Sequence, residues 1–162
     1  MKKPSENDSS RDNQQERLRT SGWIVGFVDG EGCFSVSIFR NRTTTSGWQV
    51  LPEFVVTQGA KSLHALEEIQ TFFGCGRLFI NRRHDNHREH LYRYCVRNQK
   101  DLREKIIPFF EENPLRTAKI KDFEIFKAAI QLISTNAHRN QKGIEQLISI
   151  KNSKNPQRLH VK

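Results

Sequence analysis

The sequence lacks any apolar run long enough to cross a membrane, and its N-terminus has no pattern of a signal or transit peptide. These absences disfavour a membrane protein and a secreted one. Cysteine is also scarce, because Cys33, Cys75 and Cys95 are odd in number and share no spacing typical of a metal site. We therefore expect reduced, partly buried thiols in an intracellular protein, in a bacterial cytoplasm or in the matrix or stroma of an organelle.

Positive charge, in contrast, is abundant. The 162 residues include 27 Lys and Arg against 18 Asp and Glu, which gives a formal net charge of +9 and a pI near 9.8. A chain of this length forms one domain of ordinary size, and this charge is typical of a protein that binds a polyanion. A ribosomal-type protein would carry the same charge, and so would a protein of membrane surfaces, which the absence of apolar runs disfavours.

The chain is organised around residues 23–38, which read WIVGFVDGEGCFSVSI. Within this segment the apolar spacing changes from the period of a helix to the alternation of a strand. Glu31 lies between Gly30 and Gly32 at the expected helix end, where the helix dipole disfavours a carboxylate. A divalent cation would compensate this charge, since hard cations take carboxylate and carbonyl oxygens. On these residues alone, a helix end whose Asp29 and Glu31 face water is an equal alternative.

Composition also predicts where the folded domain begins and ends. Residues 1–15 are polar and expected to be disordered, residues 16–152 are expected to form one domain, and residues 153–162 a loose basic tail. The first helix is expected to start near Gln15, with a break or an N-cap at residues 20–22.

Periodicity predicts the remaining elements. Alternating residues predict half-buried strands at 33–40 and 48–58, the second at a sheet edge or with a bulge because of Pro52. A basic hairpin follows, in which Ile80 and Tyr94 are expected to face the core. Amphipathic helices are expected at 61–73, after Asp101 up to Pro108, at 118–133 and at 142–151. The pattern predicts an α/β (α+β) domain with a four-stranded antiparallel sheet, covered by helices on one face and bare on the other.

The bare face carries side chains that suit the reading of bases. The first hairpin offers hydroxyls, amides and apolar atoms that can meet thymine methyl groups, and the second repeats arginine at strand period. Arginines in a groove would bind phosphates and guanine edges, although a merely solvated sheet face is the alternative. The candidate DNA-binding residues are Ser35, Ser37, Phe39, Arg40, Arg42, Gln49, Glu53, Arg77, Phe79, Asn81, Arg83, Arg93 and Arg97.

The spacing of His84, His87 and His90 invites a zinc site. The segment is a polar, turning loop with no cysteine nearby, and it lacks the paired spacings of closed zinc sites. A solvated hairpin tip near phosphates is the favoured interpretation.

Five segments in order resemble the LAGLIDADG homing endonucleases. Residues 24–32, which read IVGFVDGEG, resemble the family signature, and residues 54–58 resemble its second strand, which ends in a glutamine. The other segments are 74–77, 108–110 and 119–123, so the likeness runs over roughly residues 18–155. The resemblance implies the family fold, a saddle-shaped four-stranded antiparallel sheet with helices on one face, in the order ααββαββα.

The resemblance also implies an intron-encoded enzyme that hydrolyses one phosphodiester in each strand of a long pseudo-palindromic DNA site. Mg²⁺ is the implied cofactor, Mn²⁺ can replace it, and Ca²⁺ is expected to support binding without cleavage. Glu31 would be the essential metal ligand, assisted by the backbone carbonyl of Gly30. Gln58, Lys61 and Lys119 match the other catalytic positions.

Some site assignments remain open within this resemblance. Arg116 and Lys121 are close enough in sequence to replace Lys119 as the active-site cation. Many relatives have aspartate in place of Glu31 and a basic residue in place of Ser62, so the details of water activation stay open. Asp29 is expected to cap or hydrogen-bond at the helix end rather than to bind metal.

A single copy of the motif implies a homodimer whose signature helices pack side by side. The implied interface is Trp23, Gly26, Phe27 and Gly30, in which the two glycines, four residues apart, would let the helices approach closely. Such a dimer would read a roughly palindromic site. Two alternatives from other classes are an RNA maturase that acts on intron RNA and a DNA-binding regulator without catalysis. The intact Glu31 and Gln58 disfavour the regulator but not the maturase.

Overall fold

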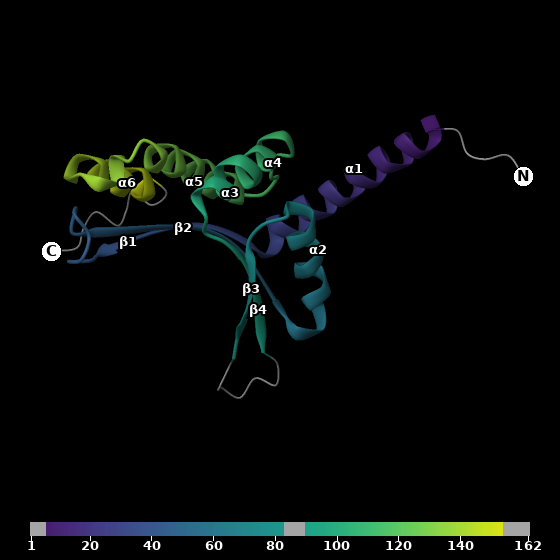
Figure 1. The fold of residues 1–162 in the computed structure, drawn as a ribbon, viewed down its shortest axis with the longest axis horizontal. Helices are drawn as coiled ribbons and strands as arrows, with labels where there is room; N and C mark the ends of the chain where they lie inside the picture. Colours follow the sequence, from purple (N-terminus) through teal and green to yellow (C-terminus); the bar gives the residue numbers. More distant parts are fainter. Residues whose placement is uncertain (1–5, 83–89, 154–162) are drawn as a thin grey trace, which may run out of the picture.

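A computed structural model describes residues 6–82 and 90–153 (Figure 1). It begins with one long helix and then forms two strand pairs separated by a helix, followed by a helical layer. The elements are α1 (Glu6–Glu31), β1 (Gly32–Arg40), β2 (Trp48–Gly59), η1 (Ala60–Ser62), α2 (Leu63–Phe73), β3 (Arg77–Asn81), β4 (Leu91–Val96), α3 (Gln99–Asp101), η2 (Leu102–Ile106), α4 (Ile107–Glu112), α5 (Lys119–Ser134), η3 (Ala137–Arg139) and α6 (Gln141–Asn152).

The predicted four-stranded antiparallel sheet is confirmed, with the strand order β1-β2-β4-β3. The predicted edge position is correct for Pro52 itself but not for the whole strand, because β2 pairs with β1 on one side and β4 on the other. Pro52 is tolerated because the pairing of β2 with β4 starts only at Phe54, opposite Val96. At Pro52 itself β2 is paired on one side only, and the missing N–H costs no bond to β4.

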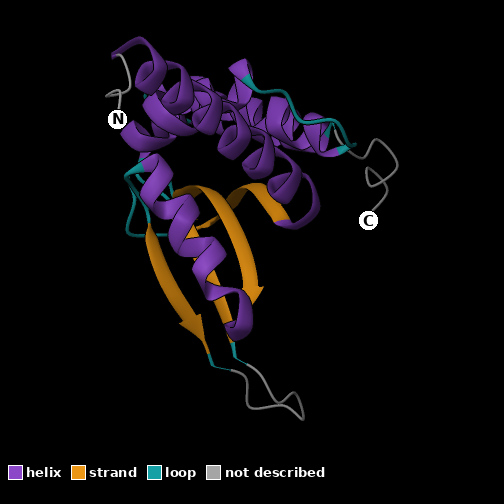
Figure 2. Cartoon of the chain, turned by 90° about the vertical axis from the view of Figure 1, so that its right-hand side faces the viewer, coloured by secondary structure: helices purple, strands orange, loops and turns teal. Residues whose placement is uncertain are grey.

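The helices cover one face of this sheet. In Figure 1, α3 to α6 lie along the β1–β2 hairpin, and α2 lies beside β3 and β4; Figure 2 shows one helix crossing in front of the strands and the others above them. Phe34 of β1 and its cross-strand partner Phe54 point into this layer, with ring centroids 5.0 Å apart. Phe110 and Phe123 close over Phe34, each 5.3 Å from its ring. The strand alternation therefore leaves the opposite sheet face without helices.

Helix α1 differs from its prediction at its start. It begins at Glu6 instead of near Gln15, and it runs without a break through residues 20–22. Good helix formers at residues 16–19 carry the helix through this weaker segment. Residues 6–15, predicted to be disordered, are therefore helical, and one helix instead of two precedes β1 among the described residues. The predicted basic tail lies outside the described residues from residue 154 onward.

The helix around Pro108 also differs from its prediction. The chain stays helical from Gln99 to Glu112 instead of ending at Pro108, because η2 is a turn of π-helix and Pro108 follows it in the first turn of α4. A proline in the first turn of a helix removes no hydrogen bond that the helix needs. The π turn before it changes the hydrogen-bond spacing, so the chain can stay helical up to the proline. Within the described residues, no helix combines the length and the apolarity needed to traverse a lipid bilayer.

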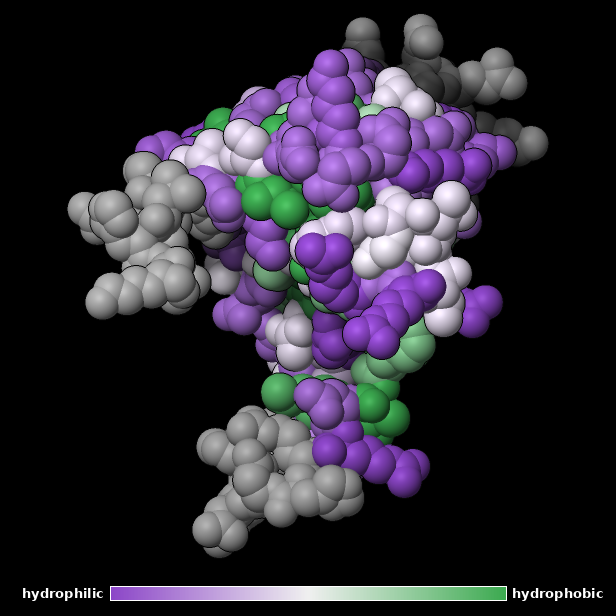
Figure 3. All heavy atoms as spheres, turned by 90° about the vertical axis from the view of Figure 1, so that its left-hand side faces the viewer, coloured by the Kyte–Doolittle hydropathy of each residue, from purple (hydrophilic) through white to green (hydrophobic). Residues whose placement is uncertain are grey.

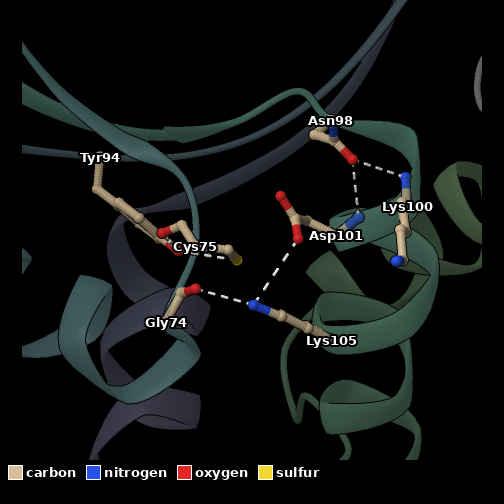
Figure 4. Close-up of polar contacts among 7 residues, drawn as sticks. All are labelled: Gly74, Cys75, Tyr94, Asn98, Lys100, Asp101 and Lys105. Carbon is tan, nitrogen blue, oxygen red and sulfur yellow. Dashed lines mark hydrogen bonds and ion pairs between the residues drawn. The ribbon is translucent and has the colours of Figure 1, made fainter.

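Side-chain contacts tie the start of β3 to the helical layer (Figure 4). Helix α2 ends at Gly74 in a left-handed conformation with φ 56°, and Lys105 Nζ donates to the Gly74 carbonyl over 2.8 Å. Tyr94 Oη donates to the next carbonyl, that of Cys75, over 3.1 Å. Lys105 also pairs with Asp101 at 3.8 Å. These bonds satisfy carbonyls at the end of α2 and fix where the β3–β4 hairpin leaves the core.

The three cysteines are free thiols. Burial raises the pKa of the Cys75 thiol and raises the pKa of Cys95 to about 11. Both are therefore protonated at neutral pH. Cys33 is exposed, which corrects the expectation that all three are partly buried, because its position on β1 alternates with Phe34 and faces away from the helices.

Candidate nucleic-acid interface

Strand register brings most of the candidate DNA-binding residues to the face without helices. On the first hairpin Ser35 lies opposite Glu53, and Phe39 lies opposite Gln49. On the second hairpin Arg93 lies opposite Phe79, and β2 joins the two hairpins because its Val55 pairs with both Cys33 and Cys95. We call this surface the open face; it carries Ser35, Ser37, Phe39, Gln49, Leu51, Glu53, Thr57, Arg77, Phe79, Asn81, Arg93 and Arg97.

The surface chemistry of this region is mixed. Seen from the β1–β2 end, hydrophilic residues dominate, with smaller apolar patches between them (Figure 3). Phe39 and Phe79, on different hairpins of the open face, are each 44 % exposed, and Leu51 is 40 % exposed. At the outer end of the first hairpin, Asn41 donates an amide hydrogen bond to Gln49 over 2.7 Å. Amides, apolar atoms and arginines therefore share one surface.

Two residues, Arg40 and Ile80, depart from their predicted environments. Arg40 pairs with Trp48 in the alternate register, on the face that bears the helices, and its guanidinium lies 4.0 Å from the Trp48 ring centroid. Ile80 pairs with Tyr92 and so lies on the predicted, helix-bearing face, but it is 44 % exposed and is not part of the core. Arg83 lies outside the described residues. Arg42 is exposed in the turn between β1 and β2.

The zinc hypothesis depends on residues that are not all described. His84 and His87 lie outside the described residues, and His90 is exposed before β4. Among the described residues, no group of three or more His, Cys, Asp and Glu side chains is arranged to hold a metal ion.

An ion-pair cluster occupies the middle of the open face. Glu53 accepts hydrogen bonds from Arg97 Nε at 2.6 Å and from Arg93 Nη2 at 3.0 Å. Partial burial opposes ionisation of Glu53, but the hydrogen bond and charge of Arg97 outweigh it and hold the pKa of the carboxyl below its usual range. All three residues were predicted from the sequence to lie in the DNA interface, but their pairing was not. Strand alternation could have placed them on one face, but the register between β2 and β4 was not apparent.

A second cluster lies where α1 ends. Glu31 is the last residue of α1, and both it and Gly30 are exposed. Asp29 accepts hydrogen bonds from the backbone N–H of Arg116 at 2.7 Å and from Thr117 Oγ1 at 2.7 Å. This geometry confirms the expected hydrogen-bonding role of Asp29. Slight burial would raise its pKa, but the bonds from Arg116 and Thr117 hold it below its usual range.

Lys119 reaches the same helix end from α5. Its half-buried side chain donates a hydrogen bond from Nζ to the backbone carbonyl of Gly32, next to Glu31. Of the three cations that the sequence left open, Lys119 is thereby tied to this centre. Arg116 contributes its backbone N–H to Asp29, and Lys121 is exposed on the first turn of α5.

Gln58 and Lys61 lie at and just after the end of β2. Gly32, the first residue of β1, pairs with Val56, so β2 continues past that pair toward Gln58 and the end of α1. Gln58 is half-buried, and Lys61 follows in η1, where it is exposed. The predicted catalytic residues thus come from α1, β2, η1 and α5; a hydrogen bond ties Lys119 to the end of α1, and strand pairing puts Gln58 two residues beyond the partner of Gly32.

One face of α1 carries glycines that the fold of this chain does not require. A Cβ atom built on Gly22, Gly26 or Gly30 would meet no atom within 4 Å, whereas one on Gly32 would lie 2.5 Å from Val28. Trp23, next to this face, is 36 % exposed, and its ring centroid lies 5.4 Å from that of Phe27. A groove of about 360 Å³ runs between this face and the segment that joins α4 to α5. The helix therefore leaves room for another backbone to approach.

Asp29 gives a prediction of pH-dependent stability. Asp29→Asn should lower the free energy of unfolding by about 1 kcal/mol at pH 7, the typical effect of losing an exposed side-chain cap. Because the folded-state pKa is depressed, the stabilisation is present above the unfolded-state pKa of about 3.9 and is lost as the pH falls through the folded value. Urea denaturation should show a larger difference from wild type at pH 7 than at pH 3. The exposed Asp12→Asn is the control, and an equal effect of Asp29→Asn at both pH values would contradict the assignment.

Comparison with known proteins decides the family. The family model described as LAGLIDADG endonuclease matches residues 24–130, which include the end of α1, all four strands and most of α5. The chain belongs to the LAGLIDADG endonuclease family. The resemblance carried by the five sequence segments is thus confirmed, and so is the fold.

Individual proteins match over most of the chain. "Probable intron-encoded endonuclease 3" of Neurospora crassa is 33 % identical over 140 residues, which are 85 % of this chain and 25 % of that protein. The crystal structure of the homing endonuclease I-TnaI has a TM-score of 0.72 and 37 % identity, over 82 % of this chain and 86 % of that one. I-SmaMI bound to an uncleaved DNA target in the presence of calcium ions has a TM-score of 0.75 and 35 % identity, over 84 % of this chain and 45 % of that one.

The chain therefore spans about a quarter of the length of the Neurospora relative. In the present chain, the part of α1 before Ile24 and all of α6 lie outside the region that the family model matches.

Proposed function

We propose that this chain is an intron-encoded, site-specific DNA endonuclease that hydrolyses one phosphodiester in each strand of a long pseudo-palindromic site. One observation carries the proposal: a bare sheet face with hydroxyl, amide and arginine side chains begins beside the exposed carboxylate of Glu31, with Lys119 tied to the adjacent carbonyl. Similar proteins named as homing endonucleases support it, and I-SmaMI is described as bound to DNA.

The residues at the end of α1 fit a hard divalent cation. They offer the Glu31 carboxylate and the backbone carbonyl of Gly30, and the negative end of the helix dipole points to the same place. Oxygen donors of this kind suit Mg²⁺ or Mn²⁺, and Ca²⁺ would bind the same donors. The bound cation would neutralise the scissile phosphate, activate a water and stabilise the leaving oxygen.

The protein residues have separate tasks in this proposal. Glu31 would hold the cation, with one such carboxylate from each of two protomers. Lys119 is oriented by the Gly32 carbonyl, so its ammonium adds positive charge beside the scissile phosphate. Gln58, as an uncharged donor and acceptor, orients the attacking water, and Lys61 adds a second positive charge at the end of β2. Asp29 anchors the segment before α5 and thereby positions Lys119.

The second protomer is a copy of the same chain. Gly22, Gly26 and Gly30 leave a helix face on which a second α1 can pack, and close helix contacts favour small residues. The chain also covers 45 % of I-SmaMI, so two copies together would correspond to about the length of that protein. A two-fold dimer would present two open faces to two half-sites, which makes the target pseudo-palindromic.

Selection from a randomised duplex library tests this function. With Mg²⁺, the cleaved products should share a pseudo-palindromic sequence. Arg77→Ala should relax the preference at one position per half-site, at a cost on the order of 1–3 kcal/mol for a lost guanine contact. Arg103→Ala is the matched control, because that arginine lies on η2 and pairs with Glu104 at 3.0 Å. The absence of cleaved DNA from the wild-type reaction would overturn the endonuclease proposal, and an unchanged site profile in Arg77→Ala would remove this part of the open face from the interface.

A further inference from the structure

We propose that Glu53 is a positioning residue for sequence recognition: it holds Arg93 and Arg97 as a preformed pair that reads guanine edges and restrains them from binding phosphate. The inference rests on the proposed function, since it assumes that the open face lies on DNA.

The geometry indicates that Glu53 positions the two arginines and does not itself contact a base. Its Oε1 accepts from Arg93, and its Oε2 accepts from Arg97 and lies 3.5 Å from the Cys95 thiol. Both carboxylate oxygens are therefore engaged within the protein. A cytosine amino group would have to compete with these partners for either oxygen.

The two arginines, in contrast, keep donors that can reach DNA. Arg97 donates to Glu53 through Nε, which leaves its two terminal nitrogens, and this fork matches the N7 and O6 acceptors of guanine. Its guanidinium also lies 5.9 Å from the Phe79 ring centroid, a second contact that restricts its orientation. Arg93 uses one terminal nitrogen and keeps the other.

Burial and charge fit the same arrangement. The Glu53 side chain is 20 % exposed, while Arg93 and Arg97 are 35 % and 56 % exposed, so the acid lies beneath the outer parts of the arginines. Burial raises the pKa of Cys95 to about 11, so this thiol stays protonated beside the carboxylate. Glu53 therefore offsets part of the positive charge at the centre of the open face.

Two consequences distinguish this role from a structural one. Side chains fixed before binding lose less conformational freedom in the complex, so the guanine contacts gain specificity. An acid between two arginines also weakens their attraction to phosphates of any sequence, because it repels the DNA backbone. Removal of the acid should thus lower specificity while it raises affinity for random DNA.

Binding selections with Ca²⁺ provide the test. Wild type, Glu53→Gln and the control Glu104→Gln, whose acid pairs with Arg103 on η2, are each presented with randomised duplex DNA. In Glu53→Gln, the preference for guanine at the positions read by the arginines should fall about tenfold, which corresponds to 1.4 kcal/mol. The slope of log affinity against log salt should steepen by about one to two units per protomer as arginines turn to phosphates. Glu104→Gln should match wild type in both measurements.

A second variant guards against a simple loss of folding. Arg97→Lys keeps the positive charge but loses the planar guanidinium. It should therefore lose the preference for guanine at one position per half-site and retain the wild-type salt slope. If wild type selects a site and Glu53→Gln selects the same site with the same salt slope, the positioning role is overturned while the proposed function stands. If Glu53→Gln lost only a preference for cytosine at one position, the positioning role would be overturned too, since Glu53 would then contact the base itself. If wild type selects no site, the proposed function and this inference both fall.

Discussion

Replacing Glu31 by glutamine should abolish DNA cleavage and leave DNA binding intact. Glutamine keeps the shape of the side chain but removes the charge that would hold the cation at the end of α1. The rate should fall by more than the roughly 100-fold that loss of a supporting residue at a metal site causes. Lys119→Met should slow cleavage less, because it removes a charge beside the phosphate and leaves the carboxylate in place. Single-turnover cleavage of a selected site in Mg²⁺ measures the rates, and binding in Ca²⁺ measures the retained affinity.

Glu112→Gln is the control for this experiment. Glu112 is an exposed acid at the end of α4, so its loss should leave the cleavage rate unchanged. A Glu31→Gln protein that cuts at the wild-type rate would show that this carboxylate is not the metal ligand.

Replacing Gly26 by leucine should convert a stable dimer into a monomer. The wild-type chain is expected to be dimeric at micromolar concentration without DNA, and a leucine on the glycine face of α1 would hold the two helices apart. The monomer itself should tolerate the change, because a Cβ at Gly26 meets no atom within 4 Å. Leucine is also a better helix former than glycine, by up to about 1 kcal/mol. Light scattering gives the mass, and thermal denaturation separates dissociation from unfolding.

Glu68→Leu provides the matched control, since it adds a leucine to an exposed position of α2 instead of α1. That variant should keep the wild-type mass. A dimeric Gly26→Leu protein would contradict the assigned interface, as would a monomeric wild type.

The sequence predicted the fold where local pattern determined it. Alternation placed Ser35 and Phe34 on opposite faces of β1, and the apolar stripe of α5 was found within one residue of its observed start. The mistakes arose where tertiary context overrides local preference. Pro108 stays within a helix because a π turn precedes it, and Pro52 lies in a central strand because its neighbour β4 is short. Neither the turn nor the strand length is encoded next to the proline.

The candidate site was predictable to a similar extent. The motif around Asp29 and Glu31 indicated both residues, and the bonds to Arg116 and Thr117 confirm the role expected of Asp29. The pairing of Glu53 with two arginines was missed, because it joins residues 40 and 44 positions apart. Sequence spacing carries no information on such a contact until the register of the strands is known. The catalytic roles of Gln58, Lys61 and Lys119 stay predictions.

Helix α1 connects the proposed dimer interface with the position of the proposed catalytic carboxylate. Gly26 and Glu31 lie on the same rigid helix, so in the proposed dimer the crossing of two helices fixes the separation of the two cutting centres. The stagger between the nicks, and hence the length of the single-stranded overhang, would then be a constant of the scaffold. Redesign of the open face for a new target should change where the protein cuts and leave the overhang length unaltered.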